Sequence, residues 1–246
     1  MNWVRVFSLA ILIGLISIGP ARGQDWAGAY AGIHAGYRWG SADLTRPAYS
    51  FPDGLGGTIL SPASIEHFKT SGPIGGGHLG YNLTPAPGFL IGIEADMTAG
   101  RDKDTTGAQT TTTIVDAERE RFFTIVQNRT SNFELGPQGT LRARLGLVDG
   151  PWLVYATGGV AFTQVEWTDT ISIVGGPASS VGKSDILTGW VVGAGVETFV
   201  APTWLVRSEY LYEDFGRMNV PLAFTSQTGK LDVTAHKLRF GVSVKF

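Results

Sequence analysis

The stretch Phe89-Leu-Ile-Gly-Ile-Glu-Ala-Asp-Met-Thr98 alternates between two kinds of residue. In an extended chain, one face of it carries only apolar side chains, namely Phe89, Ile91, Ile93, Ala95 and Met97. The opposite face includes Gly92, Glu94, Asp96 and Thr98. A period of two residues is that of a β-strand, and the 3.6-residue period of a helix does not fit it. The stretch therefore predicts a strand with one apolar face and one charged face.

The same alternation recurs along the chain, most clearly in residues 139–147 and 232–246. Applied throughout, it predicts eight strands, at residues 26–39, 73–83, 89–100, 133–147, 152–164, 187–199, 204–216 and 232–246. Strands of this length with one apolar face belong to an all-β protein.

The connections between these strands fall into two length classes that take turns. The short ones, rich in turn-forming residues, are residues 84–88, 148–151 and 200–203. The long ones are residues 40–72, 101–132, 165–186 and 217–231, and within them we expect residues 116–123 to form a hairpin above the membrane or a short helix. This order predicts an eight-stranded antiparallel up-and-down transmembrane β-barrel, with short periplasmic turns and long extracellular loops.

A soluble sandwich or a lipocalin-like barrel would also alternate, so two further features are needed to favour the membrane. Charged residues lie in the middle of several strands on one face, among glycines. Aromatic residues lie mostly near the strand ends, at the depth where aromatic girdles form. They are Trp26, Tyr37, Trp39, Tyr81, Phe89, Trp152, Trp190, Trp204, Tyr210 and Tyr212.

In such a barrel the charged face is the interior, which eight strands make just wide enough for side chains. Charges there must pair, because little water is available. The predicted interior network consists of Glu94, Asp96, Arg142, Arg144, Glu197, Arg207, Glu209 and Arg239. Within it, Glu94 and Arg142 are predicted partners, and Glu197, Arg207 and Glu209 are expected to form a second group. The alternative is a set of scattered, exposed charges.

Composition narrows the function classes. The 246 residues include 34 glycines and no cysteine, so disulfides, thiol nucleophiles and cysteine-ligated zinc are excluded. Glycine within the strands is interpreted as room for large side chains in a narrow lumen. The net charge of −2 gives no basic surface for a phosphate backbone, so no nucleic-acid partner is expected.

Residues 1–23 have the order of a secretory signal peptide. Arg5 precedes an apolar run over residues 6–18, and Ala21-Arg22-Gly23 forms a small-x-small cleavage site before Gln24. An N-terminal membrane anchor is the alternative, but the run is shorter than the about 20 residues of a spanning helix. We therefore expect an exported protein in which residues 24–246 form the barrel domain.

Several stretches carry a resemblance to a known family. The first three are Gly139-Thr-Leu-Arg-Ala-Arg-Leu-Gly146, Pro151-Trp-Leu-Val-Tyr-Ala-Thr-Gly-Gly-Val-Ala161 and Gly189-Trp-Val-Val-Gly-Ala-Gly-Val-Glu197. The others are Trp204 with Arg207-Ser-Glu-Tyr-Leu-Tyr212, Asp214-Phe-Gly216, the opening Trp26-Ala-Gly-Ala-Tyr30 and the closing residues 236–246. They resemble the small outer-membrane barrel proteins of alphaproteobacteria, a porin-like surface-antigen family distantly similar to the OmpA barrel. The resemblance implies a barrel in the cell outer membrane of a Gram-negative bacterium, with a structural role in the envelope. The long loops depart from the family pattern.

The resemblance also implies partners. A barrel in this location is expected to contact outer-membrane lipids and lipopolysaccharide. Phe246 ends an alternating apolar strand and resembles the signal that the outer-membrane assembly machinery reads, although a plain hydrophobic strand end is the alternative.

No catalytic, cofactor or metal site is expected. The four histidines, His34, His67, His78 and His236, begin no catalytic or metal-binding motif, and His34 and His236 are predicted on opposite faces of their strands. The alternatives to a structural role are a narrow porin conducting small solutes and a surface adhesin or haem-binding protein acting through its loops.

Overall fold

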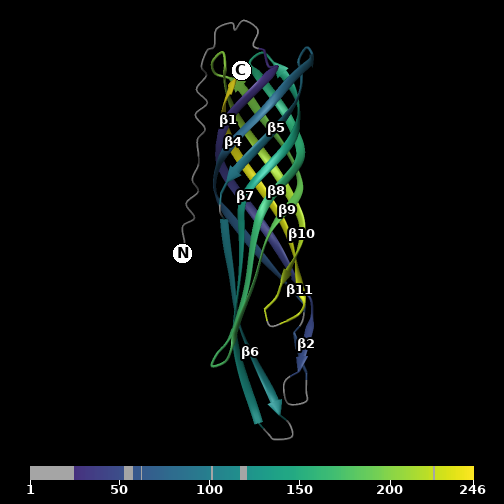
Figure 1. Ribbon diagram of the computed structural model, residues 1–246, viewed down its shortest axis with the longest axis vertical. Helices are drawn as coiled ribbons and strands as arrows, with labels where there is room; N and C mark the ends of the chain where they lie inside the picture. Colours follow the sequence, from purple (N-terminus) through teal and green to yellow (C-terminus); the bar gives the residue numbers. More distant parts are fainter. Residues whose placement is uncertain (1–24, 53–57, 62, 101, 117–120, 224) are drawn as a thin grey trace, which may run out of the picture.

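Figure 1 presents the chain as a computed structural model, which describes residues 25–52, 58–61, 63–100, 102–116, 121–223 and 225–246. The predicted signal peptide, residues 1–23, lies outside the described residues. Within these ranges, no helix is long and apolar enough to cross a membrane.

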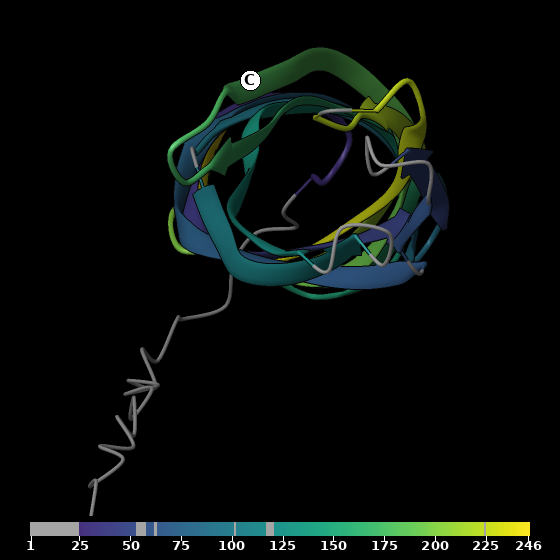
Figure 2. The same cartoon turned by 90° about the horizontal axis from the view of Figure 1, so that it is seen from below.

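The described chain folds into a closed antiparallel barrel. Its wall consists of β1 (Gly28–Arg46), β4 (Ser64–Ala86), β5 (Phe89–Ala99), β7 (Arg121–Asp149), β8 (Trp152–Ile173), β9 (Ala178–Phe199), β10 (Trp204–Pro221) and β11 (Thr228–Lys245). Each wall strand pairs with the next, and β1 pairs with β11 to close the ring, which Figure 2 shows along its axis. The predicted eight-stranded up-and-down barrel is confirmed.

Three further strands lie beyond the ring. β6 (Asp102–Asp116) continues from β5 and pairs with the outer part of β7, and the hairpin that they form reaches farther than any other in Figure 1. β2 (Tyr49–Pro52) and β3 (Thr58–Ser61) pair only with each other.

Most of the segments predicted as long loops are strands. Within residues 101–132, β6 and β7 pair from Asp102–Leu135 to Asp116–Arg121, so the hairpin expected at residues 116–123 is present, while residues 117–120 lie outside the described residues. The expected loops 40–72, 165–186 and 217–231 likewise contain the ends of wall strands. The strand boundaries predicted at these ends were therefore too short.

The apolar face changes sides along a strand, and this explains the short boundaries. In β1, Tyr37 and Trp39 point outward, whereas Ala42 and Leu44 point inward and are fully buried. Lipid surrounds the part of the barrel next to the short periplasmic turns, which is at the top of Figure 1 and is called the lower part because it faces the cell interior. Water surrounds the extracellular part, called the upper part, so outward side chains change from apolar to polar at the boundary. The alternation with a period of two continues past the boundary, but the apolar residues move to the other face. A prediction that follows a single apolar face therefore ends the strand at the boundary.

The interior is filled in three layers. A floor at the periplasmic end consists of Trp26, Leu90, Leu153, Tyr155, Phe199 and Leu205. A charged layer fills the middle. An apolar core fills the upper part, and its largest side chains are Phe68, Phe133, Trp167, Phe215 and Met218.

Trp26 was wrongly predicted to lie in the aromatic girdle. It is 3% exposed and packs edge-on against Phe199, with ring centroids 4.6 Å apart. Gly28, at a φ of 117°, adopts a conformation that side chains disfavour, and it turns the chain end into the barrel mouth. The other nine aromatic residues of that prediction point outward. Eight of them are 38–52% exposed, and Tyr212 is partly buried.

The wall opens above the membrane between β9 and β10. Their pairing ends at Trp190 and Asp214, and a bulge follows at Gly216, whose φ is 65°. Beyond the bulge, the end of β10 turns inside the wall. There the Trp167 indole donates a hydrogen bond to the Pro221 carbonyl at 3.2 Å. The upper part of β9 is left paired with β8 alone.

Glycines let strands and lumen side chains approach closely. A Cβ atom on Gly159, which faces the lumen, would lie 2.0 Å from the Leu141 carbonyl oxygen and 2.7 Å from the Cα atom of Arg142. A Cβ atom on the adjacent Gly158, which faces outward, would meet the Val191 oxygen at 3.5 Å, an ordinary contact. The glycine excess is therefore a packing requirement on the inner face.

We predict that Gly159→Ala lowers the free energy of unfolding by about 1–3 kcal/mol, because main-chain atoms must move to admit the methyl group. The matched variant Gly158→Ala should change it by no more than about 0.5 kcal/mol. Urea unfolding from lipid vesicles measures both values. Equal effects of the two substitutions would contradict the packing account.

Candidate functional site

The middle layer of the lumen is an electrically balanced set of ten charged side chains. The five acids are Glu94, Asp96, Glu197, Glu209 and Glu213, and the five bases are Arg142, Arg144, Arg207, Lys237 and Arg239. None of these side chains is more than 1% exposed. All eight residues predicted for the interior network are in this set, and the alternative of scattered exposed charges does not fit their burial.

Glu94 lies at the centre of this layer. It stands directly opposite Arg142 in the β5–β7 ladder, and the two side chains form an ion pair, in line with the sequence pattern. Arg207 reaches it from β10 at 2.5 Å, and the Tyr30 hydroxyl donates a hydrogen bond to it at 2.7 Å. One carboxylate thus joins three strands that are not all neighbours in the wall.

The second group predicted for Glu197, Arg207 and Glu209 does not form, and that prediction was wrong. Arg207 and Glu197 are cross-strand neighbours, yet Arg207 binds Glu94. Glu197 accepts a hydrogen bond from Arg144 at 2.6 Å. The lumen is so narrow that long side chains reach the far wall, and a single network results.

Glu209 and Asp96 extend the network to the last strand. Glu209 accepts hydrogen bonds from Arg142 at 2.9 Å and from Arg239 at 2.6 Å. Asp96 binds the same two guanidinium groups, each at 3.1 Å. Each carboxylate is shared by two guanidinium groups, so every charge in this part of the lumen is compensated.

Several interior polar residues were not among those predicted. Lys237 and Glu213 pair at 2.8 Å, and Arg38 and Asp102 pair at 2.6 Å. The sequence contained a signal for Lys237: it precedes the predicted interior residue Arg239 by two residues and therefore lies on the same inward face of the strand. Arg38 lies at the end of the predicted strand 26–39, and Asp102 lies in the predicted connection 101–132, where no alternation was assigned.

The four histidines fall in different environments. His34 and His78 face each other in the lumen, with their Nδ1 atoms 3.4 Å apart, and His78 Nε2 lies 2.7 Å from the Ser243 hydroxyl. His236 points outward and contacts the Tyr210 hydroxyl, so it lies on the face opposite to that of His34, as predicted. His67 is exposed beside Asp43. In the described part of the chain, no three His, Cys, Asp or Glu residues are arranged to hold a metal ion.

A second ionic cluster lies above the membrane around Asp169. This buried carboxylate accepts hydrogen bonds from Arg129, from Ser131 and from the Ala223 main-chain nitrogen, the last at 2.9 Å, and Arg46 lies 3.3 Å away. Burial alone would raise its pKa, but these hydrogen bonds and positive charges outweigh burial and hold the pKa below its usual value. The ionised carboxylate therefore anchors the end of β10 inside the wall.

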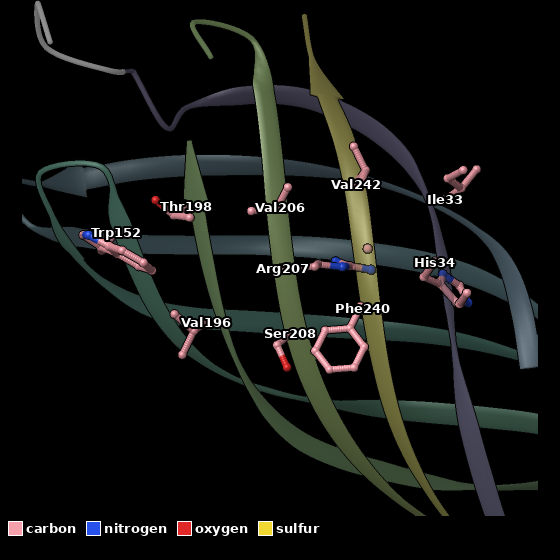
Figure 3. Close-up of a pocket in the computed structure, with 12 residues that line it drawn as sticks. Ile33, His34, Trp152, Val196, Thr198, Val206, Arg207, Ser208, Phe240 and Val242 are labelled. Carbon is pink, nitrogen blue, oxygen red and sulfur yellow. The ribbon is translucent and has the colours of Figure 1, made fainter. Parts of the chain in front are cut away.

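The outer surface has the character of a lipid-facing wall. Its exposed large residues are apolar, such as Ile33 at 71% and Met97 at 68%. A shallow hollow of about 560 Å³ lies over β10 and β11 toward the periplasmic end, as Figure 3 shows. Side chains that line it include Ile33, Trp152, Val196, Val206, Phe240 and Val242.

Comparison with known proteins places the chain in a family. Residues 8–246 match the family described as the outer membrane protein beta-barrel domain, and the chain belongs to it. It is therefore an outer-membrane β-barrel protein, and its location is the outer membrane of a Gram-negative bacterium.

Its relatives narrow the class. The chain is 30% identical over 230 residues to the 31 kDa outer-membrane immunogenic protein of Brucella melitensis. This alignment covers 92% of the present chain and 86% of the relative. The chain is 27% identical to the 22 kDa outer membrane protein of Rhizobium leguminosarum, and the alignment covers 90% of this chain and 79% of that relative. Among solved structures, the outer membrane protein OprG of Pseudomonas aeruginosa aligns with a TM-score of 0.41 and 12% identity, over 89% of this chain and 97% of OprG. The resemblance to the alphaproteobacterial surface-antigen family is confirmed.

We predict that Arg142→Met lowers the free energy of unfolding by about 3–5 kcal/mol, because Glu94, Asp96 and Glu209 lose a shared buried counter-charge. The control is Arg217→Met, which removes an exposed pair with Asp232 and should cost about 1 kcal/mol or less. Thermal and urea unfolding of the lipid-embedded barrel measure both. Similar stabilities for the two variants would show that the network does not support the barrel.

Proposed function

We propose that this protein is a structural element of the outer membrane, one that links the bilayer to a rigid extracellular part and conducts no solutes. The observation that carries this proposal is the filled lumen. In the described residues, an apolar floor, a neutralised charged layer and an apolar upper core follow one another along the barrel axis. Such an interior stabilises the barrel and provides no water-filled path.

The narrow porin is less well supported. Water-filled porins use about twice as many strands as this barrel has. A polar lumen could still conduct, but here Phe68 and Trp167 pack edge to face above the charged layer, with ring centroids 5.4 Å apart. A solute would have to displace this core.

An enzymatic role is also not supported. The buried carboxylates of the middle layer are held by arginine or lysine side chains. An acid or base held in this way is neither free to exchange protons with a substrate nor reachable by one. We therefore propose a role without catalysis or cofactor, and no feature of the described residues favours a haem site.

Lipids are the partners that the outer wall fits. The hollow in Figure 3 is lined by apolar side chains on the membrane-facing side, so acyl chains of the periplasmic leaflet can fill it. Lipopolysaccharide would surround the extracellular end of the lipid-facing part of the wall, where Tyr37, Trp39 and Trp190 form an aromatic belt.

We predict that the purified, refolded barrel gives no steady conductance in planar bilayers, because three packed layers close the lumen. Steady openings at the size of small solutes would overturn the structural proposal in favour of a porin.

Removing the protein from its bacterium should raise the sensitivity of the cells to detergent, and expression of the wild-type chain should restore their resistance. Unchanged detergent resistance without the protein would argue against an envelope role.

We propose that Phe246 belongs to the signal read by the assembly machinery, since it is 78% exposed and follows the alternating strand β11. Phe246→Ala should therefore lower the amount of barrel in the outer membrane while leaving the refolded protein's melting temperature unchanged. Quantitative immunoblotting of membrane fractions measures the first and detergent melting the second. A normal membrane level would assign Phe246 to a plain strand end.

A further inference from the structure

The upper part of β9 has an open edge. Residues 178–189 pair with β8 along their whole length, but the pairing of β9 with β10 stops at Trp190. The Pro221 carbonyl at the end of β10 and the Ala223 nitrogen just after it bond to Trp167 and Asp169 on β8. These bonds keep the main chain of β10 from pairing with this edge, which β10 meets only through the hydrogen bond from the Lys183 side chain to the Asn219 carbonyl. The edge is therefore open because its neighbour is anchored inside the wall.

The direction of the free hydrogen-bonding groups follows from the ladder. The Phe199 nitrogen bonds toward β8, at the Pro151 carbonyl, and the Val200 nitrogen bonds toward β10, at the Trp204 carbonyl. The β8–β9 register runs without a bulge, so N–H and C=O groups of even-numbered residues point to the open side. The six residues at these positions are Ala178, Ser180, Gly182, Ser184, Ile186 and Thr188. The Ile186 N–H among them donates a hydrogen bond to the Asp185 carboxylate at 2.9 Å, which an added strand has to replace.

Few features protect this edge against pairing. Sheet edges are commonly shielded by proline, by bulges or by charged side chains such as lysine. Residues 178–189 contain no proline, and their two charges, Lys183 and Asp185, pair with each other at 3.2 Å. Lys183 also donates a hydrogen bond to the Asn219 carbonyl on β10 at 3.2 Å, and Asp185 accepts one from the Ile186 nitrogen at 2.9 Å.

The side chains along the edge specify an antiparallel partner. The side chains of Lys183 and Asp185 are 39% and 47% exposed, so an added strand can reach them and replace their contacts with the Asn219 carbonyl and the Ile186 nitrogen. The fitting partner is an antiparallel strand with the pattern basic-x-acidic, where x is any residue. Its basic residue then lies opposite Asp185 and its acidic residue opposite Lys183. Ile186, which is 70% exposed, adds an apolar contact on the outer side.

We propose that the β9 edge, residues 178–189, binds an extended segment of another polypeptide by strand addition, and that the segment carries a basic-x-acidic pattern. Only a strand satisfies a row of alternating N–H and C=O groups, which defines the class of ligand. The charges set its direction and register. This surface is the edge of the extracellular part of β9, and the proposal does not depend on the structural role of the barrel.

A second copy of this chain in the same membrane does not fit the edge. The segment Lys183-Ser-Asp185 has the required pattern itself, but two barrels in one bilayer direct their β9 strands the same way through it. Their edges would meet in a parallel arrangement, whereas the charge pattern requires an antiparallel one. The same sequence as a free peptide has no such restriction, so it serves as a probe.

The test uses the refolded full chain in detergent micelles and a fluorescent peptide of residues 178–189, Ala-Ser-Ser-Val-Gly-Lys-Ser-Asp-Ile-Leu-Thr-Gly. Anisotropy titration should show saturable binding. Ser184→Pro removes one N–H on the open side and should weaken binding about tenfold, whereas Ser184→Ala keeps this N–H and should stay within about twofold. The gel shift between boiled and unboiled samples verifies that each variant is folded.

A charge exchange provides the second arm. A peptide with its Lys and Asp exchanged has the same composition but should bind the natural edge about fivefold more weakly, because like charges then face each other. The double variant K183D/D185K should reverse this preference. Absence of saturable binding, equal binding by the Ser184→Pro and Ser184→Ala variants, or an unreversed preference would each overturn the proposal. Crosslinked dimers that disappear in the Ser184→Pro variant would overturn it in favour of a second copy.

Discussion

Closure of eight strands into a ring is the constraint on which the rest of this structure depends. It satisfies the main-chain hydrogen bonds inside the bilayer, and it leaves an interior only as wide as its side chains. A charge placed there loses water and must find a partner within reach. The lumen meets this condition with five acids and five bases, and Glu94 alone is bound by Arg142, Arg207 and Tyr30.

Two properties of the barrel follow from the narrow interior. Side chains from opposite walls meet, so the ion pairs join strands that are not neighbours and brace the ring across its diameter. Glycines at positions such as Gly159 make room for this, because a methyl group there would collide with the adjacent strand. The same filling closes the path along the axis, which separates this barrel from solute-conducting porins with more strands.

The membrane boundary divides each long strand into two regimes. Below it, lipid requires an apolar outer face and the lumen takes the charges; above it, water surrounds the wall and the apolar side chains turn inward. The upper core around Phe68 and Trp167 is thus continuous with the barrel but built on the reverse pattern. At Gly216 the wall itself divides, and β10 becomes a cap anchored by Asp169.

The amino-acid sequence by itself determined the strand period, the order of short and long connections and the identity of the eight charged interior residues, because alternation is a local property of each segment. It also placed Glu94 opposite Arg142, since both lie at the same depth on neighbouring strands. Tertiary structure alone decided that Glu197 binds Arg144 and Arg207 binds Glu94, that Trp26 turns into the lumen, and that β10 leaves the wall. These contacts cross the barrel or depend on where a strand bends, and no local pattern records the distance between opposite walls.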